Sequence, residues 1–294
     1  MESNFLTAVF LPLALFIIML GMGLGLTVAD FKRVVVEPKA VIVGLIAQLG
    51  LLPLVGFGLA NIFPLSPELA VGVMILAACP GGPTSNLISY LVKGNVALSI
   101  TLTAVSSLVT VLTIPLIVNF AMAYFVGAGK MIALEFGETV LQIAVVTLLP
   151  ISIGMALKVY QPKFAATCEK AVKWLSLFFL TLIIVGLLVK ERANVASFFL
   201  QVGWVTLSLN IVMMALGYGL AIATKLDRAS AKSITVEVGI QNGTLAIAIA
   251  SAPTLLNTPT MAIPAAIYAL IMFITSGGFW WLNQRLSKSI APSP

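Results

Sequence analysis

Thr235-Val-Glu-Val-Gly-Ile-Gln-Asn-Gly-Thr244 places one carboxylate, two amides and two glycines in the middle of an apolar run. Its centre is Glu237. A charged side chain at membrane depth destabilises the inserted chain by a few kcal/mol or more, and glycines make a helix easier to open. We therefore expect a broken membrane helix whose carboxylate faces a bound or paired group.

The whole chain has the composition of a polytopic membrane protein. Of its 294 residues, 60% are hydrophobic and 9% are charged, whereas about a quarter of the residues of a soluble domain are charged. The net charge of +6 comes from Lys and Arg scattered between apolar runs, a pattern that excludes nucleic-acid binding. The chain has no histidine, the commonest general base, and this argues against an enzyme.

Apolar runs long enough to span a bilayer predict nine helices. They cover residues 5–28, 38–60, 67–92, 96–124, 132–158, 169–189, 197–224, 229–252 and 259–284. The N-terminal segment lacks the basic region and the cleavage site of a signal peptide, so we expect the first helix to be retained.

The distribution of Lys and Arg predicts the orientation of the chain in the cell membrane. Lys130, Lys190 and Arg192 fall in one set of alternate loops, and the other thirteen fall in the opposite set. Because cytoplasmic loops carry the excess of Lys and Arg, the N-terminus should lie outside the cell and the C-terminus in the cytoplasm. An odd number of helices agrees with that arrangement.

Two of the predicted helices are interrupted near mid-depth, the third by Cys79-Pro-Gly-Gly-Pro-Thr-Ser-Asn86 and the eighth by Glu237–Gly243. Proline lacks the N–H that a continuous helix needs. The two helices are five apart, so they cross the membrane in opposite directions, as in an inverted repeat. Paired interruptions of this kind indicate a transporter binding site; two simple kinks in packed helices are the alternative.

Glu237 is the only acid that we place deep in the membrane, and the sequence offers it no buried Lys or Arg. It must then be protonated or face a cation. Hard cations prefer oxygen ligands, and polar side chains lie in the apolar helices around the breaks: Gln48, Ser85, Asn86, Ser99, Thr103 and Gln241. Ser99 and Thr103 share one helix face, although bonding of each hydroxyl to its own helix is an alternative.

These motifs resemble those of the bile acid:sodium symporter family. The similarity is carried by Gly21-Met-Gly-Leu24, Ile46-Ala-Gln48, Cys79-Pro-Gly-Gly-Pro-Thr-Ser-Asn86, Gly94-Asn-Val-Ala-Leu-Ser99 and Val236-Glu-Val-Gly-Ile-Gln-Asn242. The resemblance implies an all-α, ten-helix inverted-repeat fold in which two broken helices cross. This chain looks as if it begins at the family's second helix, which leaves nine. The panel domain would comprise residues 5–28 and 132–189, and the core domain residues 38–124 and 197–284.

The resemblance also implies two sodium sites that share Glu237. The first would use Ser85, Asn86, Ser99, Thr103 and Glu237, and the second Gln48, Glu237, Gln241 and the backbone carbonyls of Val238 and Ile240. The chain departs from bacterial members at Pro83-Thr84, where they have Thr-Ala, and at Leu270-Ile-Met-Phe-Ile274, where they are polar. The substrate therefore stays open.

The first functional hypothesis is a symporter that couples sodium to a small or amphipathic organic anion. The anion would bind the helix N-termini that follow the breaks, at Thr84, Asn242 and Gly243. The second hypothesis is a proton-coupled carrier or exchanger with Glu237 as the proton site. The third is an intramembrane enzyme or sensor, for which the helices offer no acidic pair and no Ser/Lys dyad. The oligomeric state is not predicted.

Overall fold

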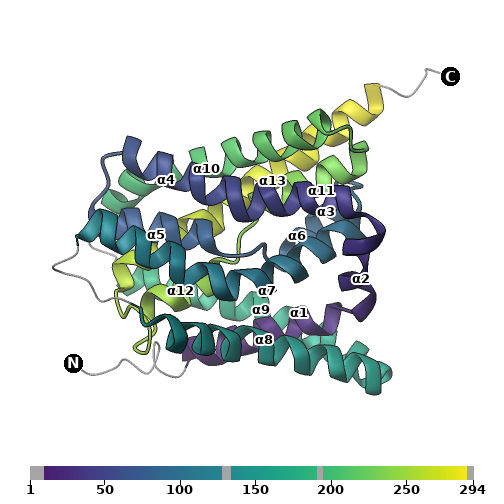
Figure 1. The fold of residues 1–294 in the computed structure, drawn as a ribbon, viewed down its shortest axis with the longest axis horizontal. Coiled ribbons are helices and arrows are strands. Elements are labelled where there is room, and N and C mark those ends of the chain that lie inside the picture. The colour runs from purple at the N-terminus through teal and green to yellow at the C-terminus, as the bar shows by residue number, and fades with distance from the viewer. Residues whose placement is uncertain (1–9, 128–133, 191–194, 290–294) are drawn as a thin grey trace.

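A computed structural model describes residues 10–127, 134–190 and 195–289. In these ranges the chain is built of helices, many of which run along the long axis of the molecule (Figure 1). Five described helices are long and apolar enough to cross a membrane, and the bent pair α1–α2 makes a sixth if it is counted as one span. The prediction of an all-helical polytopic membrane protein is confirmed.

The helices follow the apolar runs closely. In chain order they are α1 (Leu11–Gly25), α2 (Val28–Val36), α3 (Pro38–Leu45), the π-helical segment η2 (Ile46–Leu51), α4 (Leu52–Ile62), α5 (Pro67–Ala78), α6 (Thr84–Leu91), α7 (Val96–Ala121), the π-helical segment η3 (Met122–Val126), α8 (Phe136–Tyr160), α9 (Pro162–Lys190), α10 (Val195–Ala223), α11 (Arg228–Gly239), α12 (Gly243–Ser251), the 3₁₀ turn η5 (Pro259–Ala262) and α13 (Ile263–Ser289).

The largest differences from the predicted helix boundaries lie in α2 and at the start of α9. After Leu26 the chain bends by 62° into α2, which was predicted as a loop; the Asp30 carboxylate accepts from the N–H and hydroxyl of Thr27, at 2.7 Å each, and so starts a new helix. Helix α9 begins at Pro162 instead of residue 169, because proline at the first position favours a helix start. Residues 5–9 of the first predicted helix lie outside the described ranges.

The two predicted interruptions are confirmed, and they are paired with each other. Helix α5 ends before the first break and α6 begins after it, while α11 and α12 flank the second. Gly82 N donates to Ile240 O at 3.1 Å and Asn242 N donates to Pro80 O at 2.9 Å, which forms an antiparallel bridge between Gly81 and Gln241. The backbone groups freed by each break thus bind the other break.

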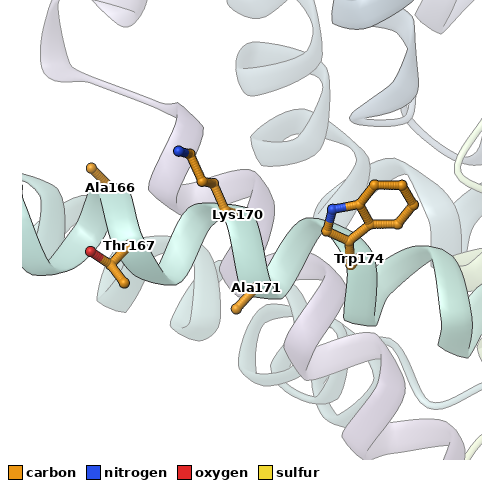
Figure 2. A pocket seen from close by; sticks show the side chains of 5 residues that line it. All are labelled: Ala166, Thr167, Lys170, Ala171 and Trp174. Atoms are coloured by element: carbon orange, nitrogen blue, oxygen red, sulfur yellow. The ribbon is translucent and has the colours of Figure 1, made fainter.

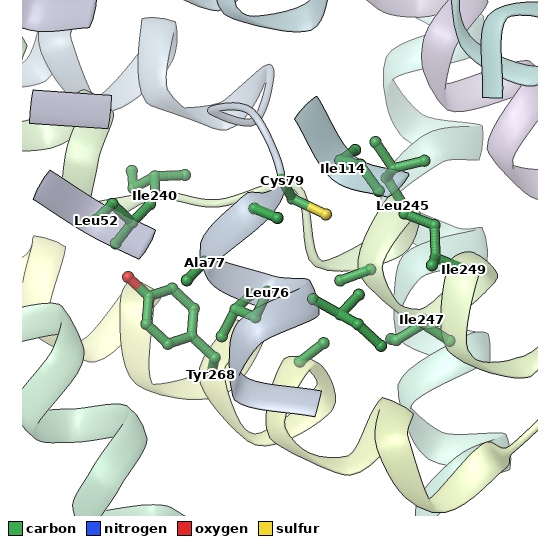
Figure 3. Packing of buried hydrophobic residues seen from close by; sticks show 14 of the residues in the cluster. Leu52, Leu76, Ala77, Cys79, Ile114, Ile240, Leu245, Ile247, Ile249 and Tyr268 are labelled. Atoms are coloured by element: carbon green, nitrogen blue, oxygen red, sulfur yellow. The ribbon is translucent and has the colours of Figure 1, made fainter. Parts of the chain in front are cut away.

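A buried apolar cluster surrounds the breaks. Leu76 and Cys79 at the end of α5, Ile240 in the second break and Tyr268 on α13 are all fully or almost fully buried, and Figure 3 shows them close together. Burial among these side chains lowers the local polarity, which strengthens electrostatic interactions within the breaks.

Helix α1 packs closely on α8, at glycines on both helices. A Cβ at Gly23 would overlap the backbone of Ile151, and one at Gly154 would lie 2.6 Å from Leu20 O. Small residues at helix contacts allow membrane helices to approach this closely. Helix α9 packs beside them on α1 and α8.

A shallow groove of about 550 Å³ runs along α9 and is lined by Ala166, Thr167, Lys170, Ala171 and Trp174 (Figure 2). All five residues come from this one helix, and none belongs to the predicted site. The groove is a surface feature of α9.

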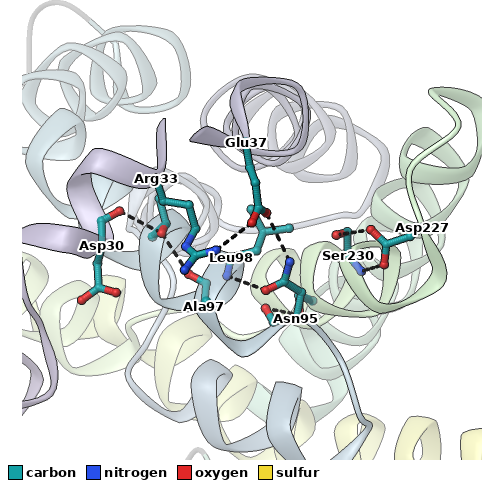
Figure 4. Close-up of polar contacts among 10 residues, drawn as sticks. Asp30, Arg33, Glu37, Asn95, Ala97, Leu98, Asp227 and Ser230 are labelled. Carbon is teal, nitrogen blue, oxygen red and sulfur yellow. Dashed lines mark hydrogen bonds and ion pairs between the residues drawn. The ribbon is translucent and has the colours of Figure 1, made fainter. Parts of the chain in front are cut away.

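Polar contacts join α2 and Glu37 to the start of α7 (Figure 4). Glu37 pairs with Arg33 at 2.7 Å and accepts from Asn95 Nδ2 at 3.3 Å. Asn95 in turn caps α7 through Leu98 N, and its carbonyl accepts from Ser233 on α11. The start of α7, and with it the register of that helix, is therefore fixed against both α2 and α11.

Candidate functional site

Glu237 lies in the last turn of α11 and is fully buried. Thr103 Oγ1 donates to its Oε1 at 2.5 Å, and Ser99 Oγ donates to its Oε2 at 3.0 Å. Ser85 Oγ is 3.3 Å from Thr103 Oγ1. A Cβ at Gly81 would overlap the carboxylate, so the first break passes directly against it. Three hydroxyls from α6 and α7 therefore gather around the one carboxylate of α11.

The hydroxyls of α7 reach Glu237 because of their spacing. Ser99 and Thr103 are four residues apart and lie on one face of the helix. Thr103 Oγ1 also approaches Ser99 O at 3.1 Å, which is the back-bonding alternative, but its contact with Glu237 is the shorter one. Ser99 donates its hydroxyl to the carboxylate.

A second polar cluster is centred on Gln48, in the π-helical segment η2. Gln48 Nε2 donates to Gln241 Oε1 at 2.7 Å and to Cys79 O at 3.2 Å, and Gln241 Nε2 donates to Val238 O at 2.9 Å. π-helical turns re-aim side chains and are frequent at functional sites. Gln48 thus links both breaks with its amide nitrogen.

Three buried amide oxygens around the breaks have no hydrogen-bond partner among the described residues: Gln48 Oε1, Asn86 Oδ1 and Asn210 Oδ1. An unsatisfied buried acceptor costs about 1–3 kcal/mol. A bound cation is the kind of partner that satisfies such acceptors, since hard cations take oxygen ligands.

The structure brings the predicted residues together in part. Ser85, Ser99, Thr103 and Glu237 form one cluster, and Gln48, Gln241 and Val238 O form the second. The carbonyl of Ile240 instead accepts from Gly82 N in the backbone bridge, and Asn86 Oδ1 bonds neither cluster.

The three predicted substrate residues lie at the N-termini of the second half-helices. Thr84, the first residue of α6, is half-buried. Asn242 caps α12, with Oδ1 accepting from Leu245 N at 3.0 Å, while its Nδ2 points to Met19 Sδ on α1 at 4.0 Å. Gly243 is the first residue of α12 and packs against α13. Asn242 therefore bridges a break and the closely packed α1.

The sequence interpretation missed two residues that touch the second break. Asn210 on α10 and Tyr268 on α13 both donate to Gly239 O, at 2.7 and 3.0 Å. The rule that singled out Gln48, a buried amide in an apolar helix, applies equally to Asn210. Tyr268 gave no comparable signal, because tyrosine in a helix is most often a packing residue.

No Lys or Arg forms an ion pair with Glu237 in the part of the chain that the structure describes; the pair found there is Arg33–Glu37. The donors around Glu237 are neutral hydroxyls. A buried carboxylate without a fixed counter-charge calls for a proton or a mobile cation.

Comparison with known proteins agrees with these features. The family model described as "Sodium Bile acid symporter family" matches residues 12–198. The chain is 35% identical to the "Uncharacterized sodium-dependent transporter YocS" of Bacillus subtilis over 89% of this chain and 78% of that protein. It is 29% identical to the "Probable sodium/metabolite cotransporter BASS2, chloroplastic" of Oryza sativa over 92% of this chain and 63% of that one.

The "Sodium/bile acid cotransporter 4" of Mus musculus is 31% identical over 96% of this chain and 65% of its own length. The chain therefore spans less than two thirds of the rice and mouse proteins. All three relatives are described as sodium-dependent transporters or cotransporters, which supports sodium-coupled transport. The chain is a membrane transport protein, not an enzyme, and it belongs to the sodium bile acid symporter family.

Proposed function

We propose that the protein is a secondary active transporter that carries an organic anion together with sodium ions by alternating access. The observation that carries this proposal is Glu237, a fully buried carboxylate that contacts hydroxyls and forms no ion pair with any residue that the structure describes. Sodium supplies the missing positive charge and leaves when the site opens, as a coupling ion must.

Two sodium ions share Glu237 in this proposal. The first binds among the hydroxyls of Ser85, Ser99 and Thr103 and takes Asn86 Oδ1 as a further ligand. The second binds beside Gln48 Oε1, Gln241 and the backbone carbonyls of Val238 and Ile240. The unpartnered amide oxygens of Gln48 and Asn86 support one site each.

We assign the helices to nine membrane spans in an inverted repeat. Helices α1, α8 and α9 form the panel, and the remaining spans form the core, with α5–α6 and α11–α12 as its broken helices. The close packing of α1 on α8 at Gly23 and Gly154 supports a panel that moves as a unit. The approach of Asn242 Nδ2 to Met19 Sδ supports substrate contacts at the boundary between the proposed panel and core.

This assignment predicts an N-terminus outside the cell and a C-terminus in the cytoplasm. An impermeant maleimide applied from outside should label a thiol at Ser3 and miss one at Ser293, two positions that lie outside the described ranges. The labelling is done in a Cys168→Ala background, because Cys168 is partly exposed whereas Cys79 is buried. Labelling of both positions from one side would remove the nine-span assignment.

We expect sodium and substrate binding to depend on different side chains. Asn242→Ala should weaken substrate binding about tenfold, because it removes an amide donor next to the substrate, and should leave sodium affinity close to wild type. Ser99→Ala combined with Thr103→Ala should weaken sodium binding first, and substrate binding only through it. Calorimetric titration of both ligands decides this; equal loss of sodium and substrate affinity in Asn242→Ala would contradict the division.

The function itself is tested by uptake and by stability. Purified protein should gain thermal stability when sodium replaces choline at constant ionic strength, and more when an organic anion that it transports is added. A panel of anions, including bile acids and small carboxylates, should contain compounds that accumulate in proteoliposomes only under a sodium gradient. Anion accumulation that does not depend on sodium and is driven by a pH gradient would refute sodium coupling.

A proton-coupled carrier is the second candidate. The observation that favours it is that the groups in contact with Glu237 are the neutral hydroxyls of Ser99 and Thr103, because a hydroxyl can rotate to accept from a protonated carboxyl group as well as donate to a carboxylate. The uptake experiment with separate sodium and pH gradients distinguishes the two candidates.

A further inference from the structure

The carbonyl of Gly239 has lost its partner within the helix. In a continuous helix it would accept from Gly243 N, but Gly243 N bonds Gln241 O at 2.9 Å instead. Gly239 is the last residue of α11 and lies two residues after Glu237. Any group that holds the Gly239 carbonyl therefore also holds the start of the second break in place.

Two side chains from outside the broken helices bind this carbonyl. Asn210 Nδ2 donates to Gly239 O at 2.7 Å and Tyr268 OH donates to it at 3.0 Å. Asn210 Nδ2 also lies 3.1 Å from Tyr268 OH. Both side chains are fully buried, so α10 and α13 hold one buried backbone atom from two sides, where hydrogen bonds are strong.

Close packing of α11 against α10 reinforces the hydrogen bond between Asn210 and Gly239. A Cβ at Gly239 would lie 2.6 Å from Met214 Cγ, one turn along α10 from Asn210. A Cβ at Gly217 would lie 2.7 Å from Val238 Cγ2. Two glycines thus let α10 approach the Val238–Gly239 backbone closely, and this fixes the direction of the neighbouring Val238 carbonyl.

We propose that Asn210 and Tyr268 are positioning residues for sodium binding: they hold the second break open, with Glu237 and the Val238 and Ile240 carbonyls in place, before the ion binds. This inference rests on the proposed sodium coupling. Neither residue contacts the ion. Their effect is preorganisation, because a break that is already fixed does not have to be ordered by the ion.

The amide oxygen of Asn210 reduces the contribution that this side chain is expected to make to folding stability. Asn210 Oδ1 is buried and has no hydrogen-bond partner among the described residues, and an unsatisfied buried oxygen is destabilising. A smaller apolar residue removes that oxygen together with the donor. Its net effect on unfolding in the absence of sodium is therefore expected to be small, whereas its effect on sodium binding is not.

The test compares Asn210→Ala and Tyr268→Phe with Thr206→Val. Thr206 lies on α10 one turn from Asn210, is equally buried, and bonds the carbonyls of Val202 and Gly203 in its own helix. The measurement is the sodium concentration that gives half of the maximal thermal stabilisation, with choline holding the ionic strength. Melting in choline alone reports stability without the coupling ion.

We expect the half-saturating sodium concentration to rise about tenfold in Asn210→Ala and about fivefold in Tyr268→Phe, which keeps the ring and loses the hydroxyl that donates to Gly239 O and accepts from Asn210 Nδ2. Thr206→Val should keep the wild-type value. An unchanged sodium midpoint in both Asn210→Ala and Tyr268→Phe overturns the proposal, even if their melting temperatures in choline are lower than that of the wild type. An equal rise of the midpoint in Thr206→Val also overturns it. If the wild-type protein itself shows no response to sodium, the proposed function fails, and the positioning role fails with it.

Discussion

Glu237→Gln is expected to fold and to lose sodium-dependent stabilisation and uptake. Glutamine keeps the size of the side chain and can still accept from Ser99, so the packing of α11 against α7 should persist. It deletes the buried negative charge that the proposed ions share. Loss of a charge-assisted interaction of about 3 kcal/mol corresponds to a loss of sodium affinity on the order of 100-fold. Sodium titration of thermal stability and uptake into proteoliposomes measure it.

The matched control is Glu68→Gln. Glu68 lies in the first turn of α5, the helix that leads to the first break, and is half-buried at the helix end. Glu68→Gln changes the net charge by the same amount as Glu237→Gln and should leave the sodium midpoint unaltered. A Glu237→Gln protein with the wild-type sodium midpoint would show that the ions bind elsewhere.

Gly81→Ala is expected to lower sodium affinity while leaving the protein folded. Among the described residues the glycine with a left-handed φ is Gly127, so the backbone of Gly81 accepts an alanine. Its Cβ, however, would overlap Glu237 Oε1 and lie 2.8 Å from Glu237 Cδ. The carboxylate is the flexible end of a side chain and can turn aside, so we expect a folded protein. Its sodium affinity should fall by at least about tenfold, because the carboxylate no longer faces Ser99 and Thr103.

Gly58→Ala on α4 is the control for this substitution, because a Cβ at Gly58 meets no atom within 4 Å. It should keep the wild-type sodium midpoint. If Gly81→Ala also keeps that midpoint, then the contact between the first break and the carboxylate has no part in ion binding.

Much of the fold follows from apolar runs, because helix length in a bilayer is set by its thickness. The prediction of 38–60 corresponds to the span Pro38–Ile62, and 96–124 to Val96–Val126. The bend at Leu26–Thr27 was not predictable in this way. The chain stays apolar through Leu26 and Val28 and contains no proline there, and the cap that starts α2 depends on the position of the Asp30 side chain.

The sequence predicted those site residues whose polar side chains are costly to bury in an apolar helix. Glu237, Gln48 and Gln241 stand out in apolar helices by type alone, and the spacing of Ser99 and Thr103 places them on one face. The pairing of Gly81 with Gln241 was not predictable, since it joins segments from the two halves of the chain through backbone atoms that every residue has. Tyr268 was not predicted, because its role depends on the contact between its hydroxyl and Gly239 O, which the helical pattern does not reveal.

Pairing between the two breaks also constrains how the protein is assembled. Synthesis proceeds from the N-terminus, so α5 and α6 leave the ribosome well before α11 and α12. Until the later segment arrives, Gly82 N and Pro80 O lack the partners that they have in the finished fold, and each unsatisfied backbone group in lipid costs several kcal/mol. The first break must therefore be inserted with temporary polar partners, and it acquires its final geometry only when α12 enters the membrane. The site is completed among the last steps of biogenesis, and a chain that stops after α10 has no means of forming it.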